Sequence, residues 1–305
     1  MSVQAAEHLD ARRYEVRHVT EYAYEADVSA SFGRACLRPR TAPGQRVIEH
    51  SIEVSPTPDV LDEHVDLFGN FSHYLEIGTP HTRLTVTKRS VVEIAWPQVD
   101  LDGLDRWTVA DAASALLADR ALDPLEHALY RLPSELVDLG PEVRAYADTL
   151  AWPQRPLGQA IAAVTHAIFR DFAYVKGATT TRTTLPELLA AREGVCQDFA
   201  HLAVGVLRAA GLPARYVSGY IETAPPPGQP RLEGSDATHA WASVQVPGGA
   251  WVDLDPTNDQ LADSRYLITA WGRDFRDVTP LKGVIFTESP TSRLRVAVDV
   301  VRLAD

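Results

Sequence analysis

Residues Glu193–His201 read EGVCQDFAH and place one of the chain's two cysteines shortly after a glycine. Apolar residues then recur at helical spacing, and Gly211 provides the expected C-terminal stop. Cys196 is therefore predicted to stand at the start of a helix. Backbone N–H groups at a helix N-terminus favour negative charge, and the thiolate is the nucleophilic form of cysteine. The stretch predicts a reactive thiol at Cys196.

The bulk composition of the chain predicts an acidic globular protein. Its 305 residues suffice for one large domain or two ordinary ones, and 45% of them are hydrophobic. A net charge of −12 argues against non-specific binding to nucleic acid or to an anionic membrane. No signal peptide, long apolar stretch or disulfide framework is recognisable, so we expect a cytoplasmic protein with reduced thiols. Composition does not determine the oligomeric state.

Residues 1–103 are predicted to form a β-rich N-terminal domain. The run Tyr14–Tyr22 has the composition of a strand, and Gly69-Asn70 has the composition of a hairpin turn. Further strand-like runs continue as far as Ile94. Short antiparallel strands joined by turns indicate a small sandwich or meander.

Residues 104–150 are predicted to form a helical connector, and residues 151–305 a core that ends in a C-terminal strand. In the core, a helical pattern beginning at Leu157 is followed by the Cys196 helix and then by a strand over 214–221. The runs 239–246 and 251–255 flank a Pro-Gly-Gly turn and predict a hairpin. We expect the Pro-rich loop 224–230 and the acidic run 233–236 to border a cleft.

Three residues of the core form a candidate catalytic set. His239 begins the first strand of the predicted hairpin and Asp255 ends the second, so the two should be neighbours. Packing of the Cys196 helix against this hairpin would bring together a nucleophile, a base and an orienting carboxylate. His239 would hold Cys196 as a thiolate and carry a proton, and Asp255 would fix the imidazole tautomer. The Cys196 backbone N–H could donate to an oxyanion.

Residues near these three are interpreted individually. Asp198 is predicted to be structural at the helix N-terminus, and His201 to be a core histidine. Gln197 is a candidate for the oxyanion hole. Trp241 is predicted to pack the hairpin and to shield His239.

Four motifs resemble the transglutaminase-like superfamily, in its bacterial cysteine-peptidase-like branch. They are Gly194–Leu202, Ala214–Tyr220, Thr238–Trp241 and Asp255–Asn258. Residues 14–24, Leu37–Arg40 and Phe68–Asn70 resemble the β-rich domain that precedes the core in that branch.

The resemblance implies an α+β protein with a papain-like core, in which a helix bearing the cysteine packs on an antiparallel sheet. By position it implies a triad of Cys196, His239 and Asp255 and acyl transfer through a thioester. The acceptor is water in hydrolysis or an amine in transamidation. An aromatic donor upstream of the cysteine helps to bind the oxyanion in related folds, which makes Tyr174 a further candidate. No cofactor, metal or calcium requirement is expected.

The leading functional hypothesis is a cysteine-dependent amidase or peptidase that acts on a peptide or protein amide, with transamidation as the alternative. A metal site built from Cys196, His201, His239 and Asp255 is a weaker alternative, because no short-spaced ligand motif is present. A non-catalytic binding module on the same fold is another, since fold does not determine function.

Overall fold

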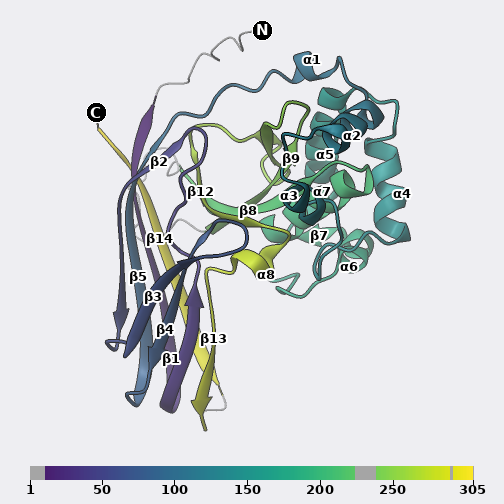
Figure 1. Ribbon diagram of the computed structural model, residues 1–305. Coiled ribbons are helices and arrows are strands. Elements are labelled where there is room, and N and C mark those ends of the chain that lie inside the picture. The colour runs from purple at the N-terminus through teal and green to yellow at the C-terminus, as the bar shows by residue number, and fades with distance from the viewer. Residues whose placement is uncertain (1–10, 224–237, 289–290, 305) are drawn as a thin grey trace, which may run out of the picture.

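The computed structural model describes residues 11–223, 238–288 and 291–304, which form a long bent β-sheet beside a sheet covered by helices (Figure 1). The bent sheet holds both ends of the described chain. Its central strand is β1 (Arg12–Ala35). Its last strand, β14 (Ser292–Leu303), pairs along its whole length with the first half of β1. The N-terminal part of the protein is therefore completed by its C-terminal residues.

The strands of this sheet pair in two successive halves. The first half of β1 pairs with β5 (His81–Ile94) and the second half with β4 (Phe71–Ile77). On the other side of β1, the first half pairs with β14 and the second half pairs with β13 (Leu281–Thr287). Outside them, β2 (Gln45–Ser55) pairs with β5, and β3 (Val60–Val65) pairs with β4.

The sheet bends between these halves. The ladder between β1 and β5 shifts its register between Ala23 and Val28, as at a β-bulge. Apolar side chains from both halves then share one cluster, including Tyr24 and Leu84 from one half and Leu75 and Ile77 from the other. The strands double back toward the core (Figure 1), which gives the sandwich-like N-terminal part that the sequence predicts.

The predicted C-terminal strand forms, but not in the core with which the sequence analysis groups it. Strand β14 pairs with β1, and Val298 and Val300 pack beside Tyr14 and Val16. Alternation of apolar and polar residues indicates a strand with one buried face, and any sheet with an open edge satisfies that pattern. The partner strand is therefore decided by packing.

Four short helices lie between the strands of the bent sheet and helix α5 in the chain. They are α1 (Leu101–Leu104), α2 (Val109–Ala118), α3 (Pro124–Leu129) and α4 (Pro141–Leu150). Proline stands in the first turn of α3 and of α4, where it replaces an N–H that has no partner in the helix. Two further helices, α5 (Leu157–Asp171) and α6 (Leu185–Ala191), lie beside the central helix of the core.

The core is built on one buried helix and an antiparallel sheet. Helix α7 (Cys196–Ala209) packs on β9 (Thr238–Gln245) and β8 (Ala214–Ile221). The sheet order is β11 (Gln260–Leu261), β10 (Trp251–Asp255), β9, β8 and β12 (Tyr266–Gly272). Helix α7 stops at Gly211, whose φ of 85° is left-handed, and Leu212 N–H returns to the Leu207 carbonyl at 3.0 Å. The remaining elements are β6 (Ala173–Tyr174), β7 (Glu193–Gly194) and α8 (Phe275–Val278).

Two side-chain amides of the N-terminal sheet region pair with the edge strand β12 of the core. The Gln45 amide donates to the Ile268 carbonyl at 2.7 Å and accepts from the Ile268 N–H at 2.8 Å. Asn70 pairs in the same way with Trp271, at 2.8 Å to its carbonyl and 3.0 Å from its N–H. Both amides are buried, so each replaces a missing neighbouring strand.

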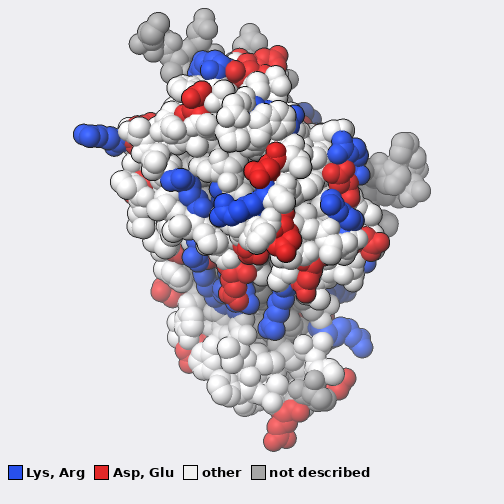
Figure 2. Space-filling view, turned by 90° about the vertical axis from the view of Figure 1, so that its right-hand side faces the viewer, with Lys and Arg blue, Asp and Glu red and all other residues white. Residues whose placement is uncertain are grey.

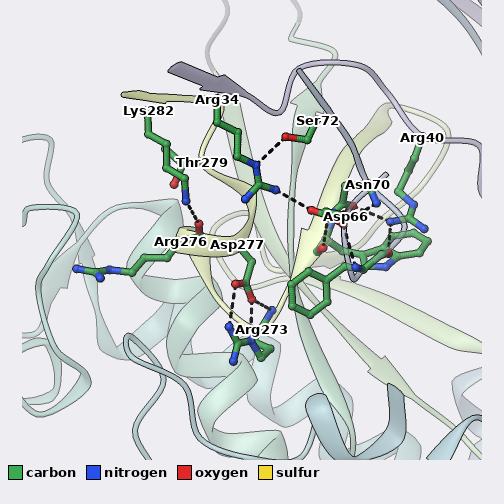
Figure 3. A network of polar contacts seen from close by, with 12 residues as sticks. Arg34, Arg40, Asp66, Asn70, Ser72, Arg273, Arg276, Asp277, Thr279 and Lys282 are labelled. Carbon is green, nitrogen blue, oxygen red and sulfur yellow. Dashed lines mark hydrogen bonds and ion pairs between the residues drawn. The ribbon is translucent and has the colours of Figure 1, made fainter. Parts of the chain in front are cut away.

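A network of charged residues orients the Asn70 amide (Figure 3). Arg40 donates to Asn70 Oδ1 at 2.7 Å, and Asp66 accepts from Asn70 Nδ2 at 3.2 Å. Arg34 in turn holds Asp66 at 2.8 Å. Because the amide oxygen faces a cation and the nitrogen faces an anion, Asn70 presents the groups that the Trp271 backbone needs.

The outer surface seen from the helical side carries charges of both signs. Arginine and lysine side chains lie among aspartate and glutamate side chains there (Figure 2). None of the helices in the described ranges is long and apolar enough to cross a membrane.

Replacement of Gln45 by leucine is expected to destabilise the protein by about 2 to 4 kcal/mol. The change leaves the N–H and the carbonyl of Ile268 buried without partners, and each such group costs roughly 1–3 kcal/mol. Urea unfolding measures the difference. The matched control is Gln159→Leu, at an exposed glutamine, where a change within about 0.5 kcal/mol is expected. Equal effects of the two substitutions would contradict the role assigned to Gln45.

Candidate active site

His239 and Asp255 form a buried pair at the ends of neighbouring strands. In the β9–β10 ladder, Leu254 pairs with Ala242, which brings the end of β10 beside the start of β9. His239 Nε2 lies 2.7 Å from Asp255 Oδ2. The Asp255 side chain is fully buried and that of His239 is 9% exposed. The neighbours expected from the hairpin are thus in hydrogen-bond contact.

Cys196 reaches this pair from the start of α7. It is the first residue of the helix and is half-buried, with its thiol close enough to His239 to influence the imidazole. Asp255 engages Nε2 of the ring, so Nδ1 is the nitrogen available to the thiol. The structure therefore brings together the three residues that the sequence analysis selects.

The local sequence before Cys196 explains how the helix starts there. Asp198 accepts a hydrogen bond from the Val195 N–H at 2.8 Å and another from Thr179 at 2.6 Å. A Cβ atom on Gly194 would lie only 3.0 Å from Asp198 Oδ2, so a glycine lets this carboxylate fold back over the turn. Asp198 thus has the structural role predicted for it.

The electrostatics of the pair favour a charged imidazole. Burial by itself lowers the pKa of His239, but the hydrogen bond to Asp255 and the contact with Cys196 outweigh it and raise the pKa to about 10. Burial tends to raise the pKa of Asp255, but the hydrogen bond from His239 and those from Tyr266 and Asn258 hold it below its usual range. The arrangement stabilises an imidazolium beside a carboxylate at neutral pH.

Further groups hold Asp255 in place. Tyr266 donates its hydroxyl to Asp255 Oδ2 at 2.7 Å, and the Asn258 amide donates to the same oxygen at 2.7 Å. The Thr257 N–H donates to Oδ1 at 2.8 Å. Asn258 lies within the Asp255–Asn258 motif, but the sequence predicts no contact with Asp255 for either Asn258 or Tyr266. Tyr266 lies on another strand, and no sequence spacing relates it to Asp255.

The residues predicted to support the catalytic set, Trp241, Tyr174 and Gln197, differ in how deeply they are buried. Trp241 is fully buried and stacks on His239, with ring centroids 6.1 Å apart, in agreement with its predicted packing and shielding role. Tyr174 is about half exposed, and burial together with the nearby Cys196 raises the pKa of its hydroxyl. Gln197 is half-buried at the second position of α7. Their part in catalysis stays a prediction.

The four residues of the alternative metal site, Cys196, His201, His239 and Asp255, do not come together, because His201 is engaged elsewhere. His201 Nε2 accepts a hydrogen bond from the Phe275 N–H at 3.1 Å, and its ring packs on Tyr216 at 4.7 Å. It is a buried histidine with its ring nitrogen engaged, as predicted, because its helical position turns it toward α8. The loop 224–230 and the run 233–236 lie outside the described residues.

Two family models match parts of this chain. The family model described as the bacterial transglutaminase-like N-terminal region matches residues 14–93, and the model of the transglutaminase-like superfamily matches residues 144–256. An uncharacterised protein of Mycobacterium tuberculosis strain H37Rv is 44% identical over 300 residues, covering 95% of this chain and 92% of its own. The chain belongs to the transglutaminase-like superfamily.

Two further proteins show how far the likeness extends. An uncharacterised protein of Mycobacterium leprae is 34% identical over 96% of this chain and 99% of its own. The crystal structure of a proposed cysteine protease from Cytophaga hutchinsonii covers 98% of this chain and 93% of its own, with a TM-score of 0.77 and 20% identity. This structural likeness supports the fold, in which a papain-like transglutaminase core follows a β-rich part.

His239 is expected to stay protonated at pH 8, where an ordinary histidine is neutral. The reason is its pKa of about 10, which the contacts with Asp255 and Cys196 support against burial. An NMR titration of the His239 ring measures this directly. In Asp255→Asn the midpoint should fall toward the ordinary value of about 6.5.

The same titration has a consequence for stability. Because the pKa of His239 is higher in the folded chain than the ~6.5 of an unfolded one, its protonation stabilises the fold fully below about pH 6.5. That contribution declines as the pH rises toward 10. An NMR titration midpoint near 6.5 for His239 in the wild-type protein would contradict the charged His239–Asp255 pair.

Proposed function

We propose that this protein is a cysteine-dependent acyl-transfer enzyme that hydrolyses a peptide or protein amide through a thioester on Cys196. The observation that carries the proposal is the buried His239–Asp255 pair, 2.7 Å apart, beside a thiol at the start of a helix. The nucleophile, the base and the orienting carboxylate are each available in the required place. We also propose that the enzyme needs no cofactor and acts in the cytoplasm, without binding nucleic acid or membrane.

In the first half of the reaction, the Cys196 sulfur attacks the carbonyl carbon of the amide. A carbon–sulfur bond forms, and the carbonyl electron pair moves to the oxygen, where backbone N–H groups at the start of α7 donate hydrogen bonds to it. His239 gives its proton to the amine nitrogen as the carbon–nitrogen bond breaks. The products are a free amine and an acyl group bound to Cys196 as a thioester.

In the second half, a water molecule attacks the thioester carbon. His239, now neutral, takes a proton from the water, and the carbon–sulfur bond breaks to release a carboxylic acid and the Cys196 thiolate. Asp255 remains charged throughout and stabilises the imidazolium whenever it forms. The proton that His239 gave to the amine is thus replaced by one from water, which restores the imidazolium and the thiolate at the end of one turnover.

The alternative acceptor is an amine, which would give transamidation. A Pseudomonas aeruginosa protein named as a protein-glutamine gamma-glutamyltransferase is 35% identical over 124 residues, which is 38% of this chain and 18% of its own. This partial likeness keeps transamidation as the second candidate. A binding module without catalysis is a third, and the charged imidazole beside the thiol argues against it.

Replacement of Cys196 by alanine is expected to abolish amide hydrolysis and rapid labelling by iodoacetamide, while thermal unfolding stays similar. The change removes only the sulfur from a half-buried side chain. The matched control is Cys36→Ser, because burial raises the pKa of the Cys36 thiol to about 12 and makes it a poor nucleophile. Mass spectrometry assigns the label to each cysteine. Full activity in Cys196→Ala would overturn the proposal.

Replacement of Tyr266 by phenylalanine is expected to lower kcat roughly 3- to 30-fold with little change in KM. Loss of one neutral-to-charged hydrogen bond of about 1.5–3 kcal/mol to Asp255 leaves His239 less well oriented, and part of that energy appears in the barrier. Steady-state kinetics measures the effect. Tyr146→Phe removes a longer tyrosine–aspartate hydrogen bond, of 3.3 Å to Asp171, and should leave kcat unchanged. Equal kcat values for the two variants would show that Tyr266 does not position the site.

A further inference from the structure

Three metal-binding side chains meet inside the bend of the N-terminal sheet, outside the candidate active site. His50 lies on β2, Glu63 on β3 and His73 on β4, and one ligand atom from each lies within 4.8 Å of the others. His73 Nε2 is 3.1 Å from Glu63 Oε2, across a directly paired register position of β3 and β4. In a tetrahedral zinc site with bonds of about 2.0–2.1 Å, neighbouring ligand atoms are ~3.3 Å apart. Glu63 and His73 therefore already have a ligand-like separation.

The free nitrogen of His50 completes the set. His50 Nδ1 lies 3.0 Å from the Ser90 hydroxyl, which fixes the ring. His50 Nε2 is buried and has no hydrogen-bond partner among the described residues, and the His50 and His73 ring centroids are 5.9 Å apart. A histidine with one nitrogen held by a neighbour and the other unengaged is the usual arrangement of a metal ligand.

We propose that His50, Glu63 and His73 bind one divalent transition metal ion of the zinc class. Two imidazoles and one carboxylate are a donor set that zinc accepts, and solvent can supply a fourth ligand. Glu63 is 31% exposed along its side chain, which gives the ion a path from solvent.

The protonation of the two histidines is compatible with this site. Burial and the neighbouring Lys88 lower the pKa of His50 to about 3, and burial lowers the pKa of His73. Both rings are therefore neutral at pH 7, as metal binding requires.

Cations also surround the site. Arg38 donates to Glu63 Oε1, which leaves Oε2 for the ion, and burial lowers the pKa of Lys88 to about 7. His64, next to Glu63 on β3, is near enough to help lower the pKa of His73. These groups reduce the affinity for a cation, and the Glu63 carboxylate offsets part of their charge.

A bound ion would join the two halves of the bent sheet. His50 belongs to β2, which pairs with the half formed by β5, whereas Glu63 and His73 belong to the other half. A metal bound only by the folded protein stabilises it by mass action. The site would therefore fasten the bend, independently of the thiol chemistry.

Zinc titration of the full-length, untagged protein tests the proposal, in the Cys196→Ala background so that the active-site thiol contributes no ligand and only the buried Cys36 thiol remains. After chelator treatment and dialysis, calorimetry with Zn²⁺ should show one site per chain. Zinc at 100-fold above Kd should raise Tm by about 5 °C. X-ray absorption of the zinc-loaded protein should show nitrogen and oxygen ligands at about 2.0–2.1 Å.

Single variants in that background locate the ion. His50→Gln and His73→Gln should each weaken zinc binding at least about 10-fold, and Ser90→Ala, which removes only the support of His50, should weaken it less. The matched control is His166→Gln, which breaks an exposed histidine–aspartate pair of 2.9 Å and should leave zinc affinity unchanged.

Two outcomes would overturn the proposal. One is no zinc binding by the Cys196→Ala protein, and the other is equal zinc affinity in His50→Gln, His73→Gln and His166→Gln. Circular dichroism of each metal-free variant shows whether it is folded. If His50→Gln does not fold, Ser90→Ala decides, because unchanged zinc affinity in that variant would also count against the site. The proposed amide hydrolysis does not depend on this zinc site, so either outcome would leave that proposal standing.

Discussion

The pairing of Gln45 and Asn70 with the backbone of β12 is the contact on which the rest of the molecule depends. Strand β12 is the edge of the core sheet, and its outward N–H and carbonyl groups would otherwise be buried without partners. The N-terminal part supplies those partners with side-chain amides. Trp96 adds a hydrogen bond of 2.9 Å from its indole to the Tyr266 carbonyl. The bent sheet therefore sets where β12 lies.

This contact leads directly to the candidate active site. Tyr266 is the first residue of β12, and its hydroxyl donates to Asp255, which holds His239. The cost of burying the Asp255 carboxylate is offset by the hydrogen bonds and the charge that surround it. A role for the N-terminal part follows from these contacts: it positions the strand that supports the carboxylate. The N-terminal part thus contributes to the proposed catalysis indirectly, through a chain of contacts from β12 to Asp255 and His239.

The N-terminal sheet and the core share one buried cluster where they meet. Tyr220 of β8 packs with Tyr14 and Val16 of β1, and its hydroxyl lies 2.9 Å from His18 Nδ1. The ammonium of Lys88 lies 4.5 Å from the centroid of the Tyr220 ring. Apolar and polar contacts thus cross the boundary together. The predicted boundary at residue 103 marks a change from strand-like to helical sequence. The side chains of the two parts nevertheless pack together in one cluster.

The sequence alone determined the local structure and the candidate residues. The glycine before Cys196, the apolar period of α7 and the hairpin ending at Asp255 depend on neighbours in the chain, so short-range patterns reveal them. Only the tertiary structure showed that β14 completes the N-terminal sheet and that Tyr266 supports Asp255. It alone also brought His50, Glu63 and His73 together. These contacts join strands that are far apart in the chain or separated by a bend, and no residue spacing encodes which edges meet. Packing of the whole molecule decides them, because burial of apolar faces and pairing of buried polar groups must be satisfied together.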